Sequence, residues 1–249
     1  MNKTYLISGA GSGIGKAIAQ KLASEGNKCI LLGRKETMLI ETLGQLEGQD
    51  HAVLVADIRD IEGLAKAADH VKDIPLHGLI ANAGIGGENY WGDGDRWYNI
   101  INTNLTGTYQ FVNTFLPNLR LATGERHILI TSSVLARLGV DNYSAYCASK
   151  VGLLGLMRSW AAQYAREEIL INAICPGWVD TEMSQEGLQG IADGLGITKD
   201  EFYKIAMQSV PLRRMSQPEE IADLVAYLLS QRSITGQTID INCGAIMNS

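Results

Sequence analysis

Tyr146 and Lys150 stand four residues apart in the stretch YCASK, within a segment of helical pattern. Side chains at this spacing share one face of a helix, so both can point toward one ligand. A phenol titrates near ~10, so proton transfer by it near neutral pH calls for a pKa shift of around three units, or ~4 kcal/mol. A cation ~4 Å away at an effective dielectric constant of ~20 supplies roughly that much. Because such a pair is common by chance, acid–base chemistry needs support from further groups.

Ser133 stands 13 residues before Tyr146, just after the apolar run at 128–131. That run predicts a buried strand, at whose carboxyl end a hydroxyl can hold a substrate oxygen and stabilise the charge that develops on it. A nucleophilic serine would instead want a G-x-S-x-G turn and a paired histidine, and neither appears. The four histidines are scattered without metal-ligand spacing, so no metal site is expected.

Three glycines, Gly9, Gly13 and Gly15, lie between the first predicted strand and the first predicted helix. In such a turn a phosphate can approach backbone N–H groups and the positive end of the helix dipole. The spacing G-x-x-x-G-x-G matches neither the usual dinucleotide fingerprint nor a P-loop, because Lys16 and Ala17 stand where those motifs need a glycine and a hydroxyl. The glycines alone fit a tight turn equally well, but their place after the first strand favours a ligand.

The second predicted strand ends in LLGRK, with Arg34 and Lys35 and no carboxylate. In dinucleotide-binding sheets this point meets the adenosine ribose, where an acid selects NAD and an arginine can grip the 2′-phosphate of NADP. The sequence therefore predicts NADP, as NADPH, over NAD; the alternative is that these are solvated turn charges. Asp57, just past the third predicted strand, can accept from the adenine amino group or cap the following turn.

Short β-type runs alternate with longer helical patterns along the whole chain, which predicts a parallel sheet with helices on both faces. The expected strands are 4–8, 28–32, 51–55, 78–81, 128–131, 170–174 and 238–242, and the clearest helices are 61–72, 98–116, 144–166 and 218–229. A glycine-rich loop at 84–95 interrupts the alternation. The weakly helical segment 182–210 predicts a flap. With no linker or repeat, we expect one domain over 1–249.

Composition bounds the class of protein. The chain has 249 residues, 46% of them hydrophobic, and a formal net charge of −6. These values exclude a disordered chain and argue against nucleic-acid or anionic-membrane binding, although a local basic patch stays possible. The four cysteines form no C-x-x-C pair, and neither a signal peptide nor a membrane span is evident. We expect a cytoplasmic protein.

The motifs together resemble the short-chain dehydrogenase/reductase family nearly end to end. The resemblance rests on SGAGSGIG at 8–15, NAG at 82–84, Asn104, Ser133, Tyr146-x-x-x-Lys150 and Pro176-Gly177. It implies an α/β, doubly wound Rossmann fold of seven parallel strands and hydride transfer between nicotinamide and a carbonyl or alcohol carbon. It also implies that Tyr146 is the general acid/base, that Lys150 binds the nicotinamide ribose and lowers the Tyr146 pKa, that Ser133 orients the substrate, and that Asn104 holds a water in a proton relay.

The resemblance also implies a set of cofactor-binding residues. In this chain they are Gly9, Ser12, Gly13, Ile14, Gly15, Arg34, Asp57, Ile58, Asn82, Ala83, Gly84, Tyr146, Lys150, Pro176, Gly177, Val179 and Thr181. Two departures are Ser8, where the family commonly has threonine, and Asn242-Cys243-Gly244, where it usually has Asp-Gly-Gly. The first keeps the hydroxyl, and the second could alter contacts between subunits.

We expect an NADP-dependent oxidoreductase acting on a ketone or secondary alcohol, with similarity to 3-oxoacyl-carrier-protein reductases and polyketide ketoreductases. The substrate would be a small molecule, which an acyl thioester could carry, and an acidic carrier would need basic residues such as Arg137, Arg213 and Arg214. The alternatives are an NAD-dependent alcohol dehydrogenase of the same family and a non-catalytic, cofactor-binding regulatory protein. By analogy the assembly is a homotetramer or homodimer.

Overall fold

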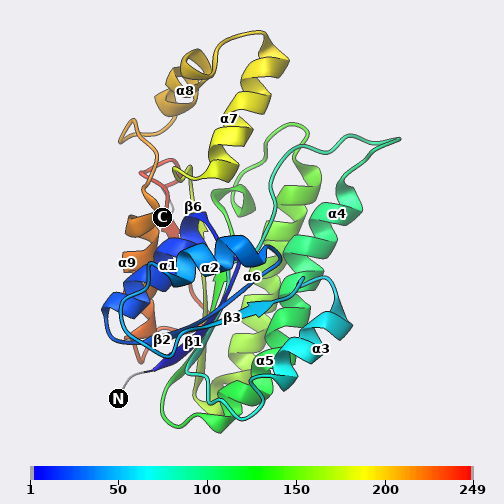
Figure 1. The fold of residues 1–249 in the computed structure, drawn as a ribbon. Helices are drawn as coiled ribbons and strands as arrows, with labels where there is room; N and C mark the ends of the chain where they lie inside the picture. Colours follow the sequence, from blue (N-terminus) through cyan, green and yellow to red (C-terminus); the bar gives the residue numbers. More distant parts are fainter. Residues whose placement is uncertain (1–2, 248–249) are drawn as a thin grey trace.

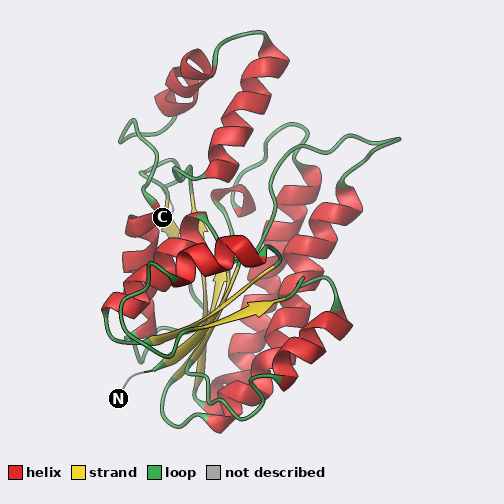
Figure 2. Ribbon diagram, viewed as in Figure 1, coloured by secondary structure: helices red, strands yellow, loops and turns green. Residues whose placement is uncertain are grey.

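In the computed structural model, which describes residues 3–247, seven parallel strands form one sheet in the order β3-β2-β1-β4-β5-β6-β7 (Figures 1 and 2). The predicted single-domain, doubly wound α/β fold is thereby confirmed. The order reverses direction between β1 and β4, so the carboxyl ends of these two strands flank the switch point. The strands are β1 (Thr4–Ser8), β2 (Lys28–Gly33), β3 (Ala52–Val55), β4 (Gly78–Ala81), β5 (Arg126–Thr131), β6 (Ile169–Pro176) and β7 (Thr238–Ile241).

Helices cover both faces of the sheet, and each face has its own apolar core. Successive strand residues point to opposite faces, so Leu6 lies in one core and Ile7 in the other. This double burial explains why the strands are almost continuously apolar. One core packs under α3 (Ile61–Asp69), α5 (Gly107–Leu121) and α6 (Ser144–Tyr164), the other under α1 (Gly13–Ser24), α2 (Glu36–Leu43) and α9 (Pro218–Leu229).

The prediction of one continuous helix over 98–116 is wrong in detail. The segment divides into α4 (Trp97–Ile101), a π-helical segment η1 (Asn102–Thr106) and α5. The wide turn coincides with Asn104, whose side chain bonds the backbone of Ile85 instead of pointing outward. Single π-helical turns of this kind are frequent at functional sites. A period of 3.6 residues in the sequence cannot reveal them, because the apolar pattern continues across the wide turn.

The segment predicted as a flap contains two helices, α7 (Glu182–Leu195) and α8 (Lys199–Gln208). Both have threonine N-caps, Thr181 and Thr198, and Gly196 ends α7 with a φ of +68°. They extend beyond the carboxyl edge of the sheet (Figure 1) and share a small apolar cluster with the chain near Met215. No helix in the described part of the chain combines the length and the apolar character that spanning a membrane requires.

Candidate active site

The loops after β1, β4, β5 and β6 meet at the carboxyl edge of the sheet, because neighbouring parallel strands end on the same side. Ser8, the last residue of β1, connects the loop after β1 to the loop after β4. Its hydroxyl accepts hydrogen bonds from the backbone N–H groups of Asn82 and Ala83 at 3.0 and 3.1 Å, and it donates to the Ile80 carbonyl at 3.3 Å. The departure from threonine therefore keeps the hydroxyl that joins these loops.

The glycine turn is closed so tightly that side chains are excluded at two positions. A Cβ on Gly15 would lie 2.2 Å from the Gly9 carbonyl oxygen, and a Cβ on Gly9 would lie 2.9 Å from the Ala83 Cα. Gly9 also has a φ of +69°, a conformation that L side chains rarely adopt. Asn82 donates from Nδ2 to the Ser8 carbonyl at 3.3 Å. The predicted motifs at 8–15 and 82–84 therefore form one packed unit.

The first turn of α1 fits a phosphate group. Ser12 occupies the N-cap position without a side-chain hydrogen bond to the helix, so the first N–H groups have no cap from this residue. Gly13 has a φ of +50°, and a Cβ there would approach the Thr181 methyl at 3.1 Å. Ile14 follows at the second position of the helix. Uncapped amides and absent side chains suit the pyrophosphate of a dinucleotide.

Arg34 is exposed just after β2, and its positive charge helps to lower the pKa of the Asp57 carboxyl. Asp57 is engaged: Arg59 donates to it from the backbone at 2.9 Å and from the guanidinium at 2.6 Å, and these bonds lower the Asp57 pKa. The structure thus shows the turn-capping role for Asp57. Ile58 is buried, with Cδ1 only 2.8 Å from where a Gly107 Cβ would lie, so only its backbone is available to a cofactor.

The residues after β6 pack against the tail of the chain. Pro176 is the last residue of β6, and Gly177 donates from its backbone to the Ile241 carbonyl at 3.0 Å. A Cβ on Gly177 would lie 2.9 Å from the Asn242 Cβ. Val179 is 3% exposed, and the hydroxyl of Thr181 caps α7. The Asn-Cys-Gly segment at 242–244, which departs from the family pattern, therefore packs directly against the predicted Pro-Gly motif.

Asn104 and Lys150 approach each other across Gly84. A Cβ on Gly84 would lie 3.1 Å from Asn104 Oδ1 and 3.5 Å from Lys150 Nζ. Asn104 accepts from the Ile85 N–H at 2.8 Å and donates to the Ile85 carbonyl at 2.9 Å. Lys150 donates from Nζ to the Thr131 carbonyl at 3.0 Å. Both side chains are buried, so their polar groups are held in fixed positions.

Tyr146 lies between Lys150 and Ser133. Lys150 Nζ is 5.5 Å from the centre of the Tyr146 ring, and the Ser133 hydroxyl is close enough to the phenol to oppose, in part, the rise of the Tyr146 pKa. Ser133 also accepts from the Leu135 N–H at 3.1 Å, which leaves its own proton to donate. The structure therefore brings Ser133, Tyr146 and Lys150 together at the edge that also carries the glycine turn.

The fold by itself shifts the pKa of Tyr146 upward, opposite to the lowering that the family resemblance implies for the working site. Burial raises the pKa of Tyr146 to about 12, since removing a phenolate from water costs more than the Ser133 hydrogen bond returns. Burial also lowers the pKa of Lys150 to about 8. At neutral pH the site therefore holds a neutral phenol beside a mostly protonated ammonium.

Two serines that the sequence analysis did not single out support this group. Ser132 donates to the Lys150 carbonyl at 2.9 Å, and Ser149 donates to the Tyr146 carbonyl at 2.7 Å. Asn104 in turn donates to the Ser149 hydroxyl at 3.1 Å. Their adjacency to Ser133 and Lys150 in the sequence is the signal that could have identified them.

The three arginines considered for an acidic carrier all have partners. Arg137 pairs with Asp240 at 3.2 Å, and Arg214 forms two bonds with Glu220 at 2.7 Å. Arg213 donates to backbone carbonyls at the end of α8. Each guanidinium is therefore already engaged within the chain.

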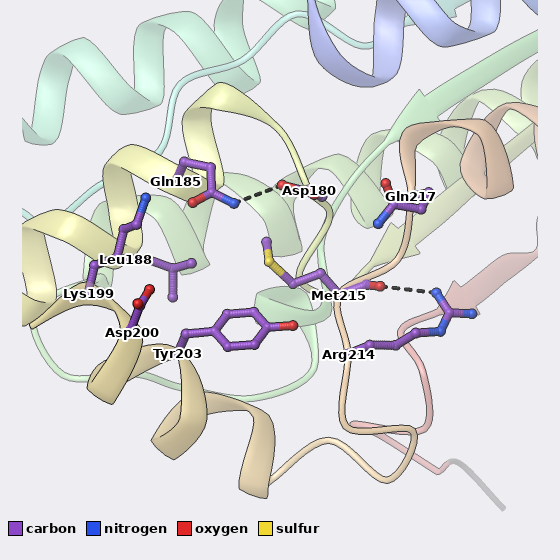
Figure 3. A pocket seen from close by; sticks show the side chains of 9 residues that line it. All are labelled: Asp180, Gln185, Leu188, Lys199, Asp200, Tyr203, Arg214, Met215 and Gln217. Atoms are coloured by element: carbon purple, nitrogen blue, oxygen red, sulfur yellow. Dashed lines mark hydrogen bonds between the residues drawn. The ribbon is translucent and has the colours of Figure 1, made fainter.

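A separate cavity of about 370 Å³ lies at the base of α7 and α8 (Figure 3). Gln185 and Asp180 are hydrogen-bonded at 2.8 Å on one side of it, and Arg214 donates to the Met215 carbonyl on the other. Among its lining residues there is no predicted catalytic or cofactor-binding residue, although Arg214 is one of the arginines considered for a carrier. It is therefore distinct from the Ser133 and Tyr146 group. Within residues 3–247, no cluster of acidic, histidine or cysteine side chains has an arrangement that could hold a metal ion.

Comparisons with known proteins agree with this geometry. Residues 9–245 match the family model described as enoyl-(acyl carrier protein) reductase. The chain is 32% identical to the 3-oxoacyl-(acyl-carrier-protein) reductase FabG of Pseudomonas aeruginosa, over 99% of this chain and 98% of that one. It is also 32% identical to the acetoacetyl-CoA reductase of a Synechocystis species, over 97% and 95%.

A solved structure of a variant of actinorhodin polyketide ketoreductase with NADPH superposes with a TM-score of 0.91 at 28% identity, covering 98% of this chain and 97% of that one. The matches extend over nearly the whole chain in sequence and in fold. This chain is therefore an oxidoreductase that belongs to the short-chain dehydrogenase/reductase family.

Proposed function

We propose that the protein is an NADPH-dependent carbonyl reductase that converts a ketone, of the 3-oxoacyl type, to a secondary alcohol. The observation that carries this proposal is the buried group at the sheet edge: a neutral Tyr146 phenol near the Ser133 hydroxyl and next to the Lys150 ammonium. Named relatives that act on 3-oxoacyl and acetoacetyl thioesters support the substrate class.

The cofactor would lie along the carboxyl edge, where the residues fit a dinucleotide. The uncapped start of α1 and the tight glycine turn suit its pyrophosphate. Arg34 suits the 2′-phosphate, and Lys150, beside Gly84, suits the nicotinamide ribose. When bound, NADPH would supply the hydride that is added to the carbonyl carbon. A solved relative that contains NADPH supports this choice over NAD.

The protein side chains then handle the carbonyl oxygen. Ser133 would donate a hydrogen bond to that oxygen and hold it near Tyr146. Tyr146 would give its phenolic proton to the oxygen as negative charge develops, which completes the alcohol. Lys150 would stabilise the phenolate that remains, and Asn104, with its link to Ser149, would support the route by which the proton is replaced.

Burial keeps Tyr146 in its protonated form at neutral pH. A phenol with a pKa of about 12 is protonated at neutral pH, which is the form that donates a proton. Oxidation of an alcohol would need the phenolate at the start of the reaction. The alternative of an NAD-dependent alcohol dehydrogenase is the less favoured one, because Arg34 suits a 2′-phosphate and a solved relative contains NADPH. A location in the cytoplasm and a dimeric or tetrameric assembly stay predictions.

The test is oxidation of NADPH and of NADH by the purified protein with a panel of ketones that includes 3-oxoacyl thioesters. The proposal expects turnover with NADPH, weaker turnover with NADH and the best rates on a 3-oxoacyl thioester. Arg34→Glu should weaken the binding of NADPH more than that of NADH. Lys66→Glu, on the exposed side of α3, should leave the affinity for both cofactors unchanged. Cofactor binding without turnover of any ketone would instead support a non-catalytic protein.

A further inference from the structure

The helices that carry the proposed catalytic residues begin next to the glycine-rich loop at 84–95. Tyr146 and Lys150 lie on α6, and Asn104 lies on η1, directly after α4. Neither helix is capped by the residue at its own N-cap position: Tyr143 and Arg96 form no side-chain bond to the first turns. Their first amides therefore depend on groups from elsewhere in the chain.

Asn89, in the middle of that loop, supplies the cap for α6. Its Oδ1 accepts from the Ala145 N–H at 2.9 Å and from the Ser144 hydroxyl at 3.1 Å. Its own N–H donates to the Asn142 carbonyl at 2.7 Å, which fixes the turn that leads into the helix. Asn89 is 8% exposed, so it has been taken out of water for these bonds. Ala145 immediately precedes Tyr146.

Asp95 supplies the matching cap for α4. Its Oδ1 accepts from the Trp97 N–H at 2.9 Å and, at 3.3 Å, from Asn89 Nδ2. The orientation of the Asn89 amide is set at both ends, because its oxygen must face two donors and its nitrogen must face a carboxylate. One amide and one carboxylate thus connect the starts of two helices that are far apart in the sequence.

We propose that Asn89 and Asp95 form a clamp that sets the positions of Tyr146 and Asn104 relative to each other, so that both clamp residues are positioning residues for the reaction. The clamp belongs to the loop that leaves β4 beside the proposed nicotinamide site, so a displacement of this loop would move the start of α6 and, with it, the phenol. This role rests on the proposed reductase function.

The first test is Asn89→Ala, with Asn113→Ala as control. Asn113 is a half-buried asparagine whose side chain bonds only a carbonyl of its own helix among the described contacts. Misplacing a reacting group by about 1 Å costs on the order of a hundredfold in rate, so we expect kcat to fall by about tenfold to a hundredfold in Asn89→Ala. The Kd for NADPH should change by less than about twofold, since the clamp does not bind the cofactor.

The second test keeps the fold and reverses the clamp. Asn89→Asp retains the oxygen that caps α6 but places a carboxylate against Asp95, so kcat should fall. Adding Asp95→Asn restores a donor between the two positions at unchanged net charge, and the double variant should recover kcat to within about threefold of the wild type. This pair decides the matter even if Asn89→Ala fails to fold. Equal kcat in the wild type and Asn89→Asp, or no recovery in the double variant, would overturn the clamp.

Amide hydrogen exchange over residues 144–147 separates this inference from the proposed function. Exchange should be faster in Asn89→Ala than in the wild type. In the double variant and in Asn113→Ala it should proceed at the wild-type rate. A wild-type protein without ketone turnover would contradict the proposed function, and the exchange rates would still decide whether the clamp exists. Unchanged exchange in Asn89→Ala would contradict the clamp whatever the activity.

Discussion

The carboxyl edge of the sheet and the pair of helices α7 and α8 are built in opposite ways. At the edge, Asn104, Ser133 and Lys150 are each at most 7% exposed and each holds a hydrogen bond to the chain. On α7 and α8, Met183, Leu195 and Ile205 are between 47% and 60% exposed. The difference indicates that the proposed reacting groups are fixed by the fold, whereas the apolar side chains on α7 and α8, where we propose that the substrate is selected, are open to solvent.

Of the changes at the carboxyl edge, Tyr146→Phe should reduce turnover the most. It removes the proton donor and keeps the ring, so turnover should fall by about a thousandfold or more while NADPH still binds. Steady-state NADPH oxidation and titration of the cofactor fluorescence would measure the two effects. Turnover within tenfold of the wild type would show that another group supplies the proton.

The pH dependence of ketone reduction should report on Lys150. With its pKa lowered to about 8, Lys150 carries its charge below that pH and loses it above. We therefore expect kcat/KM to be level between about pH 6 and 7.5 and to fall by about tenfold per unit well above pH 8. Lys150→Arg, which stays charged, should lose this fall even though its overall rate is lower. A level profile up to pH 10 would contradict the assignment.

Two glycine substitutions, one in the glycine turn and one on α7, should have opposite effects on the free energy of unfolding. Gly15→Ala would place a methyl group 2.2 Å from the Gly9 carbonyl, so the turn must shift, and we expect a loss of roughly 1–3 kcal/mol in the free energy of unfolding. Gly190→Ala, on α7, meets nothing within 4 Å and should stabilise by about 0.5–1 kcal/mol. Thermal unfolding would measure both changes. Equal effects of the two substitutions on stability would contradict the difference in packing between the two regions.

Met183→Ala should have the smallest effect. The Met183 sulfur would lie 3.5 Å from a Cβ on Gly86, whose other near neighbour is the Tyr146 ring, so the thioether borders the proposed substrate site. We expect KM for a 3-oxoacyl thioester to change by about threefold to tenfold, because one partly exposed side chain is worth about 1 kcal/mol. The melting temperature should stay constant. Unchanged kinetics across a series of acyl lengths would indicate that α7 does not contact the substrate.

The same contrast governs what could be predicted from the sequence. Local spacing was enough for the strands, the glycine turn and the pairing of Tyr146 with Lys150, because each depends on neighbours within a few residues. The π-helical turn at Asn104 and the cap that Asn89 gives α6 depend on contacts across 19 and 56 residues. The upward shift that burial gives the Tyr146 pKa could likewise not be read from the sequence, since it depends on how much water the folded chain leaves around the phenol.

Ultraviolet difference titration of the cofactor-free wild type against Tyr146→Phe tests the central claim most directly, because tyrosinate absorbs where tyrosine does not. The claim is that the fold holds Tyr146 as a neutral proton donor, so no tyrosinate from this residue should appear below about pH 10. An ionisation step assigned to Tyr146 between pH 7 and 9 would contradict it.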